Sequence, residues 1–251
     1  MKKVLLVAAS VLFLMTSCQL DNYDGPNAKI HGRILDEKTG ELVGTDIQNG
    51  SRLMVYEQGY AASETHSNGE TWVIMNTGEY ANNLVFAGEY EVIFENGNFY
   101  GFNDFFTINK GDNEVDWKVT PYLRIKNCSI SKSGSIVTAK FSLEGGKGNE
   151  KVSEVRLFAF SDKWVGNYVK FPIEGGSKIA FGAKDGAGNI ANPVVTVDPS
   201  REYTLTIDTE KNKSFFKYTG KNYYFRVGAK ASVSGAGTIR HNYSELVKIA
   251  F

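Results

Sequence analysis

The chain is poor in the residues that support redox and metal chemistry. Its 251 residues include 2 cysteines and 3 histidines, and none of them stands in a CxxC, HxH or HExxH arrangement. Cys18 belongs to an N-terminal targeting segment, so Cys128 has no partner for an intramolecular disulfide. Cys128 is more typical of a small buried apolar residue than of a nucleophile. The sequence therefore predicts no metal site of the Cys/His type and no cofactor.

Long hydrophobic runs are also missing. The longest one, Val4–Met15, has 12 residues and is interrupted only by Ser10, whereas a helix needs about 20 to cross a bilayer. This run follows Lys2 and Lys3 and leads into the small residues before Cys18. A basic segment, an apolar segment and small residues in this order predict a secretory signal peptide over residues 1–17.

Met15-Thr16-Ser17-Cys18 resembles a bacterial lipobox, in which the cysteine is diacylated and becomes the mature N-terminus. The resemblance implies that Cys18 is a lipid attachment site and that residues 18–28 form a lipidated tether. Each buried acyl CH₂ contributes about 0.8 kcal/mol, so several chains anchor a protein stably. The acidic stretch after Cys18 resembles the surface-export signal of Bacteroidetes lipoproteins. We expect a lipid-anchored, surface-exposed protein of the outer membrane; the alternative is an ordinary signal peptide with an incidental cysteine.

Helical periodicity with capping residues is absent, and alternation with a period of two residues takes its place. It occurs at Glu89–Glu95, Glu114–Val119, Glu202–Asp208 and Tyr223–Ala229. In the first segment Tyr90, Val92 and Phe94 share one face, which leaves Glu91 and its neighbouring glutamates on the solvent side. Strands with one solvated face are typical of antiparallel sandwiches. The sequence predicts an all-β fold.

Charge of one sign is scarce in each half of the chain, although the whole sequence has a formal net charge of 0. Residues 18–120 carry 17 acidic and 6 basic side chains, and residues 121–251 carry 11 acidic and 20 basic ones, so the halves have net charges of −11 and +9. We place a domain boundary at Thr120-Pro121. Either the halves attract each other across a shared interface, or the basic half faces an anionic partner. Acidic polysaccharide is a more accessible anion for such a protein than nucleic acid, which we do not expect as a partner.

Residues 29–43, KIHGRILDEKTGELV, resemble carboxypeptidase-regulatory-like, prealbumin-type sandwich domains. Asp36 and Thr39-Gly40 fit the turn after the first strand of such domains. Residues 121–251 contain about seven strand-like runs and resemble an immunoglobulin or fibronectin type III sandwich. Together with its leader, the chain resembles a two-domain family of Bacteroidetes outer-membrane lipoproteins associated with starch-utilisation-like uptake systems. This resemblance implies two tandem antiparallel β-sandwiches, residues 29–120 and 121–251, and brings no active site.

Motifs of catalysis are not found. There is no GxSxG and no Walker loop. Residues 186–191 fit GxGxxA, but Pro193 and a strand-like run follow where a dinucleotide site needs a helix. Lys184–Asn189 instead resembles the D-x-A-G-N turn of bacterial Ig-like modules; Asp185 and Asn189 could ligate Ca²⁺, but a plain tight turn is the favoured interpretation. A glycosidase needs a carboxyl group in a desolvated cleft, so acids on solvent faces do not indicate one. We expect the protein not to be an enzyme.

Aromatic residues are abundant and give the remaining candidates for a ligand site. Trp117 is in phase with apolar neighbours, and Trp72 is expected to be buried. Trp164 and Tyr168 lie in a polar, glycine-containing stretch, and Tyr100 lies between two strand-like runs. Because sugar rings stack on exposed aromatic faces, these three residues are the predicted ligand-binding residues.

Two functions follow from these features. The first is a non-catalytic surface lipoprotein that serves as an accessory glycan- or ligand-binding component of a polysaccharide uptake system, in contact with polysaccharide, oligosaccharide or an outer-membrane uptake complex. The alternative is a structural or adhesive cell-surface protein that acts through protein–protein contacts, for example by strand addition.

Replacing Cys18 by alanine tests the predicted anchor. We expect the Cys18→Ala protein to incorporate no labelled palmitate and to leave the membrane fraction, because its only lipobox-like cysteine is gone. The matched control is Cys128→Ala, which keeps the label and the membrane fractionation. Palmitate incorporation by Cys18→Ala, or its unchanged fractionation, would contradict the assignment.

Overall fold

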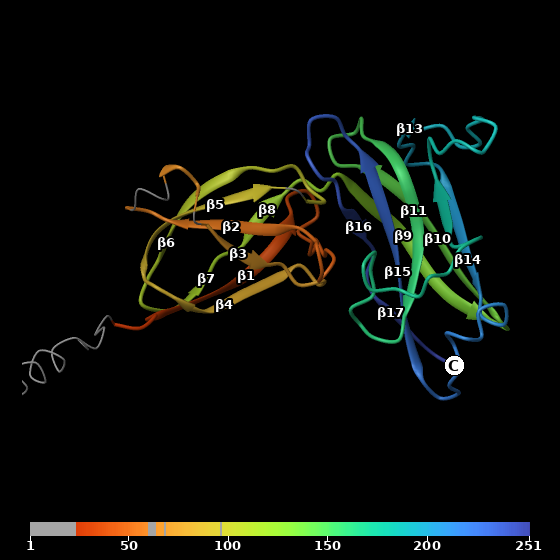
Figure 1. Cartoon of the computed structure of the whole chain (residues 1–251), viewed down its shortest axis with the longest axis horizontal. Helices are drawn as coiled ribbons and strands as arrows, with labels where there is room; N and C mark the ends of the chain where they lie inside the picture. The colour runs from red at the N-terminus through yellow and green to blue at the C-terminus, as the bar shows by residue number, and fades with distance from the viewer. Residues whose placement is uncertain (1–23, 60–63, 68, 96) are drawn as a thin grey trace, which may run out of the picture.

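The computed structural model describes residues 24–59, 64–67, 69–95 and 97–251. The named elements in this part of the chain are all strands, and they form two sandwiches that lie end to end (Figure 1). The predicted signal peptide and Cys18 lie outside the described residues, so lipid attachment stays a prediction. Among the described residues, no helix has the length and apolarity that a bilayer-spanning segment requires.

The first half of the chain supplies eight strands. They are β1 (Ala28–Asp36), β2 (Arg52–Glu57), β3 (Glu70–Val73), β4 (Glu79–Val85), β5 (Gly88–Glu95), β6 (Asn103–Ile108), β7 (Gly111–Glu114) and β8 (Trp117–Val119). One sheet has the order β4-β1-β7, with β8 also paired to β1, and the other has the order β3-β2-β5-β6. All pairs are antiparallel except those of β1 with β7 and β8, which are parallel.

Aromatic rings fill the space between these two sheets. Trp117 packs against Tyr80 and Phe94, with ring centres 5.0 and 5.4 Å apart. Trp72 and Trp117 are each only 4% exposed, which confirms both as core residues. The Tyr90 and Phe94 side chains of β5 also lie in this core, as the alternation of the sequence predicts.

Glu91 departs from that alternation, because its side chain is buried and not solvated as predicted. His66 Nε2 lies 2.9 Å from one of its carboxylate oxygens, and Asn103 Nδ2 donates to the other over 3.1 Å. These hydrogen bonds, with that of His66 foremost, hold the pKa of Glu91 below its usual value. Polar partners on the outer face of the sheet thus cover a residue that period-two alternation places in water.

The alternating run Glu114–Val119 does not form one strand. It is interrupted between β7 and β8, where Asp116 Oδ1 accepts a hydrogen bond from Arg33 N at 2.8 Å. The neighbouring Val115 carbonyl accepts one from Tyr80 Oη at 2.7 Å. Gly32 permits this, because a Cβ at that position would lie 1.7 Å from the Val115 oxygen.

The second half of the chain supplies nine strands. They are β9 (Leu123–Ser133), β10 (Ile136–Gly145), β11 (Lys151–Phe160), β12 (Lys178–Ala180), β13 (Val195–Thr196), β14 (Glu202–Asp208), β15 (Asn222–Ser232), β16 (His241–Tyr243) and β17 (Val247–Ala250). A three-stranded sheet β14-β10-β9 faces a six-stranded sheet β12-β11-β15-β16, in which β13 joins β11 and β17 joins β15. All of these pairs are antiparallel. The predicted all-β fold of two sandwiches is confirmed.

The connection between the sandwiches is short and is hydrogen-bonded along its length. Only residues 120–122 separate β8 from β9. Tyr100 N donates to Thr120 O, and Tyr122 N donates to Asn98 O, at 2.9 and 3.0 Å. Pro121 forms a bridge with Phe99. The linker thus pairs with the segment that follows β5, which restrains the two halves relative to each other.

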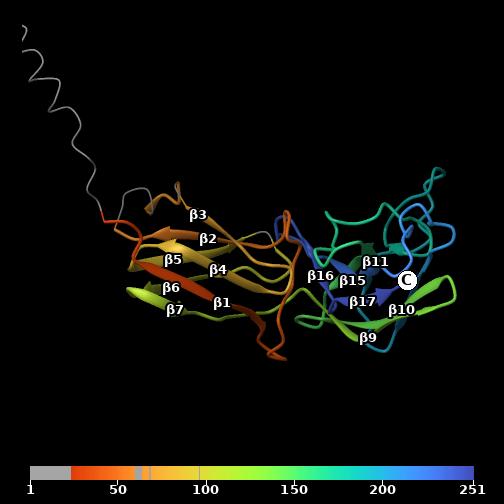
Figure 2. The ribbon, with the colours of Figure 1, turned by 90° about the horizontal axis from the view of Figure 1, so that it is seen from below.

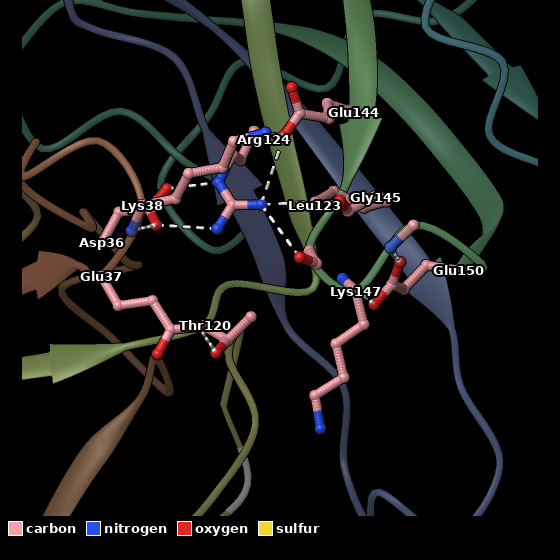
Figure 3. A network of polar contacts seen from close by, with 12 residues as sticks. Asp36, Glu37, Lys38, Thr120, Leu123, Arg124, Glu144, Gly145, Lys147 and Glu150 are labelled. Atoms are coloured by element: carbon pink, nitrogen blue, oxygen red, sulfur yellow. Dashed lines mark hydrogen bonds and ion pairs between the residues drawn. The ribbon is translucent and has the colours of Figure 1, made fainter.

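An ion pair is buried where the sandwiches meet (Figure 3). Arg124 donates from Nε and Nη2 to the two oxygens of Asp36, at 2.5 and 2.7 Å, and the two side chains are 5% and 6% exposed. Glu144 lies 3.4 Å from Arg124 and 2.7 Å from the exposed Lys38. Burial opposes ionisation of Asp36, but hydrogen bonds from Arg124 and from Lys38 N outweigh it, so the pKa of Asp36 is lowered.

A second buried cation crosses the junction from β15. Arg226 donates to the carbonyls of Thr45 and Asn76 in the first sandwich, at 2.8 and 3.2 Å. Its guanidinium carbon lies 3.5 Å from the centre of the Tyr243 ring. Tyr243 Oη in turn donates to Asp46 Oδ2 at 2.6 Å. Burial lowers the pKa of Arg226 and raises that of Tyr243, so this group is a desolvated polar cluster.

Two asparagines complete the junction. Asn98 Nδ2 donates to Gly44 O and to His241 O, at 2.8 and 3.1 Å, and Asn242 Nδ2 donates to Asn98 O at 2.7 Å. Asn242 Oδ1 also accepts the Leu123 N–H. Acids of the first half and arginines of the second therefore meet across a shared interface, which was one of the two explanations for the charge segregation.

Replacing Arg124 by methionine should lower the free energy of unfolding by about 3–5 kcal/mol, because Asp36 would remain buried without its partner. The control is Lys38→Met, which loses only an exposed contact and should cost no more than about 1 kcal/mol. Urea unfolding at pH 7 measures both. A loss in Arg124→Met no larger than in Lys38→Met would contradict the role of this pair.

The same pair gives a pH dependence. Since the folded pKa of Asp36 is lowered, its contribution to stability is present above the unfolded value of about 3.9 and is lost as the pH falls through the folded pKa. In Arg124→Met, Asp36 loses the hydrogen bonds and the charge of Arg124 while its burial and the hydrogen bond from Lys38 N remain, so its pKa is higher than in wild type. The deficit of the variant relative to wild type should therefore shrink as the pH is lowered toward 4.

Candidate functional site

A pocket of about 510 Å³ lies at the junction of the two sandwiches. We call it the junction pocket; it is lined by Phe94, Phe99, Tyr100, Gly101, Tyr122 and residues 233–237. Its aromatic side comes from the end of β5, the segment after it and the linker, and its other side from the loop between β15 and β16. Small-molecule sites occupy about 300–1,000 Å³ and often lie between domains, so the size and the position both suit a ligand.

Tyr100 is held rigidly at the edge of this pocket. Its hydroxyl donates to Glu150 Oε1 of the second sandwich at 2.6 Å, and its ring meets the Tyr122 ring edge to face, with centres 4.7 Å apart. Lys147 Nζ lies 3.8 Å from the centre of the Tyr100 ring. Burial and the Glu150 carboxylate raise the pKa of the Tyr100 hydroxyl. The half-buried ring is therefore a fixed, neutral surface.

Glu150 accepts the hydrogen bond from Tyr100, and it also lies beside Lys147 in the turn after β10 (Figure 3). Besides Tyr100, it accepts hydrogen bonds from the backbone N–H groups of Lys147, Gly148 and Asn149, at 2.7, 3.0 and 3.1 Å. Burial raises the pKa of Glu150, but these bonds more than compensate, so the net pKa is lowered. Glu150 orders the turn between β10 and β11 and stays ionised.

The other two predicted aromatic residues lie in the loop after β11, which also reaches the junction. Trp164 is half-buried, with Lys163 Nζ 4.9 Å from its ring centre, and Lys163 O accepts a hydrogen bond from Asn76 of the first sandwich. Tyr168 is 42% exposed, and its hydroxyl accepts a hydrogen bond from Arg240 Nη1 at 2.6 Å. The structure thus brings all three predicted residues to the junction, although only Tyr100 lines the pocket.

Sequence reasoning missed several residues of the site. Arg240 connects Tyr168 to the segment after β5. Its side chain donates to the Tyr168 hydroxyl, and its backbone N–H donates to Gly97 O at 3.0 Å. The loop Ser234-Gly235-Ala236-Gly237 forms one wall, and its glycines are the one sequence signal that marks it as a loop. Tyr122 looks like an ordinary strand residue beside Pro121, and nothing in the sequence distinguishes it as part of a pocket.

Asp185 and Asn189, the weak calcium candidates, lie on an exposed turn. Asp185 Oδ1 accepts hydrogen bonds from Ala187 N and Asn189 N, at 2.9 and 2.8 Å, and Oδ2 accepts one from Asn189 Nδ2 at 3.1 Å. These bonds lower the pKa of Asp185. The arrangement is that of a turn closed on its own side chains, the interpretation favoured from the sequence.

His241 lies in β16 and is buried. Its Nε2 is 3.1 Å from Glu154 Oε1, and Lys178 Nζ is 3.4 Å from Glu154 Oε2. Burial of Glu154 is outweighed by these two partners, and its pKa is lowered to about 2. Within the described ranges, no three His, Cys, Asp or Glu side chains gather as metal ligands.

Comparisons with known proteins cover almost the whole described chain. A family model described as the N-terminal domain of a "Protein of unknown function (DUF3823)" matches residues 28–120, and a second, "Domain of unknown function (DUF3823_C)", matches residues 123–248. None of the curated proteins is significantly similar to the chain.

Solved structures show the same two-domain arrangement. A protein of Bacteroides uniformis described as a "putative carbohydrate binding protein" is 49% identical, with a TM-score of 0.81 over 90% of this chain and 100% of that one. DUF3823 family proteins of Parabacteroides merdae and Bacteroides ovatus are 23% and 21% identical, each with a TM-score of 0.66. They cover 90% and 89% of this chain and 100% and 98% of their own, and they show that the fold is shared.

Proposed function

This chain belongs to the DUF3823 family, and from that premise we propose that it is a non-catalytic saccharide-binding protein of the cell surface. In this proposal Cys18 carries the lipid anchor in the outer membrane. The two sandwiches then serve a polysaccharide uptake system as an accessory component that holds saccharide at the junction pocket.

The observation that carries the proposal is the similarity to the Bacteroides uniformis protein. The 49% identity extends over 90% of this chain and 100% of that one, and so includes both sandwiches and the junction between them. That protein is described as a "putative carbohydrate binding protein". A saccharide ligand is therefore the first class to test here.

The chemistry of the junction pocket supports this ligand class. A pyranose ring has a C–H face that packs on an aromatic ring and hydroxyl groups that need hydrogen-bond partners. The half-buried ring of Tyr100 supplies apolar surface, and the exposed backbone of Gly235 and Gly237 and the hydroxyl of Ser234 offer donors and acceptors. Binding sites for small ligands combine these two elements.

The electrostatics of the pocket support a role without catalysis. A glycosidase needs one carboxyl group whose pKa is raised so that it can donate a proton. Glu150 is the acid that contacts Tyr100, and hydrogen bonds from Tyr100 and from backbone N–H groups of the turn outweigh its burial and lower its pKa. A carboxylate with a lowered pKa and engaged oxygens orients Tyr100 and is unsuited to donate a proton to a leaving group.

The direction of the chain supports display away from a membrane. The first described residues lie at the end of the first sandwich that is farthest from the second (Figure 2). An anchor before β1 would therefore leave the junction pocket and the second sandwich pointing outward. Soluble polysaccharide could reach both.

Tyr100→Ala tests the site. We expect the full chain, purified in detergent, to bind at least one neutral glycan of a broad panel, and Tyr100→Ala to weaken that binding about tenfold, or about 1.4 kcal/mol, through loss of the stacking surface. Calorimetry on the retained glycan measures the change.

The control is Phe105→Ala, which removes a side chain that is 63% exposed on β6 and does not line the pocket. It should leave affinity unchanged, and thermal melting should show that both variants fold. Absence of binding across the panel, or equal affinity of Tyr100→Ala and wild type, would overturn the proposal.

A further inference from the structure

The end of the second sandwich that lies away from the junction is rich in lysine. Residues 209–221, which join β14 to β15, contain four lysines and one acid, Glu210. The far end of β9 and the strand β17 reach the same end and add two more (Figure 1). We call the following set the basic tip: Lys132, Lys213, Lys217, Lys221 and Lys248.

Contacts of Phe251 hold this end together. Lys132 Nζ on β9 lies 4.8 Å from the centre of the Phe251 ring. Phe251 N donates to Lys221 O at 3.1 Å, and Phe251 O accepts the Gly220 N–H. Thr209 N donates to Ser135 O at 2.8 Å, which fixes the start of the loop against the hairpin after β9. The lysines therefore project from a structured surface.

Positive charge outweighs negative charge at the basic tip, because residues 209–221 contain four lysines and one acid. Across the described ranges none of its five lysines lies within ion-pair distance of a carboxylate. Lys211, by contrast, lies 3.9 Å from Asp208. Glu210 is the remaining acid of the loop. The first sandwich cannot neutralise the tip, because the tip lies at the opposite end of the second sandwich from the junction.

An aromatic ring is displayed among these cations. Tyr218 is 63% exposed, and its ring centre is 5.6 Å from Lys221 Nζ. Its backbone N–H donates to Tyr223 Oη at 3.3 Å, which ties its backbone to the core strand β15. A large exposed ring with ammonium groups beside it offers an apolar face and positive charge at one place.

We propose that the basic tip is a second binding site and that it takes polysaccharides that carry carboxylate groups, such as polyuronates. The sugar ring packs on Tyr218, and its carboxylates meet Lys217 and Lys221. This inference rests on the proposed saccharide function but uses a surface separate from the junction pocket. It also uses the second explanation for the charge segregation, a basic half that faces an anionic partner.

Binding of polygalacturonate to the full chain in detergent tests the site. Wild type should bind it, and the affinity should fall steeply between about 50 and about 300 mM NaCl because exposed charges are screened. Lys217→Gln/Lys221→Gln should weaken binding roughly tenfold and Tyr218→Ala roughly fivefold. Tyr100→Ala should leave it unchanged, whereas neutral glycans should depend on Tyr100 alone.

The matched control is Lys151→Gln/Lys184→Gln, which removes two exposed lysines of the same half at other positions. Equal loss in the two double variants would show that only net charge matters and would overturn the site. Absence of polygalacturonate binding would also overturn the site. The same holds if polyacrylate, which has carboxylates but no sugar rings, binds with the same affinity and Tyr218→Ala has no effect. Failure of neutral glycan binding with these results intact would instead overturn the junction pocket.

Discussion

The orientation of the two sandwiches depends on polar groups that are buried between them. Asp36 and Arg124 form an ion pair with almost no exposure, and Arg226 reaches two carbonyls of the other half. Apolar surfaces can slide over one another at little cost, but a buried donor without its acceptor is penalised by its full desolvation. Another docking that kept these groups away from water would leave Asp36, Arg124 and the Nη groups of Arg226 without these partners, so the contacts favour the observed docking. The junction pocket exists because that docking brings Tyr100 to Glu150.

Charge has two separate uses in this molecule. At the junction, Asp36 and Asp46 of the acidic half meet Arg124, Arg226 and Tyr243 of the basic half in a desolvated setting. At the far end of the second sandwich, the five lysines of the basic tip form no ion pair with a carboxylate in the part of the chain that the structure describes. The formal net charge of 0 does not reveal this arrangement, because it adds the paired charges at the junction to the exposed lysines of the basic tip.

Much of the fold was predictable because alternation is a local property of the chain. Strands such as β5 and β14 follow directly from their residues, and Trp72 and Trp117 lie in the core as their phase indicates. Glu91 was not predictable, since its burial depends on His66, which is 25 positions away. The junction could not be predicted either: Arg226 sits in an alternating strand like any solvated arginine, and only the docked partner shows that it is buried. The aromatic candidates are the rings that fall outside the alternation of the core strands. This property identifies Tyr100, but it does not identify the other residues that line the junction pocket.

The hydrogen-bonded linker has a consequence for the energetics of ligand capture. In proteins whose two domains move about a hinge, a ligand that contacts both domains must also fix their relative orientation. The loss of conformational entropy lowers the affinity. Here residues 120–122 and the paired 98–100 segment already fix that geometry. A ligand in the junction pocket would therefore bind between walls that are already in place. Its affinity would depend on its own contacts with those walls, because no conformational entropy would be lost in closing the two domains around it.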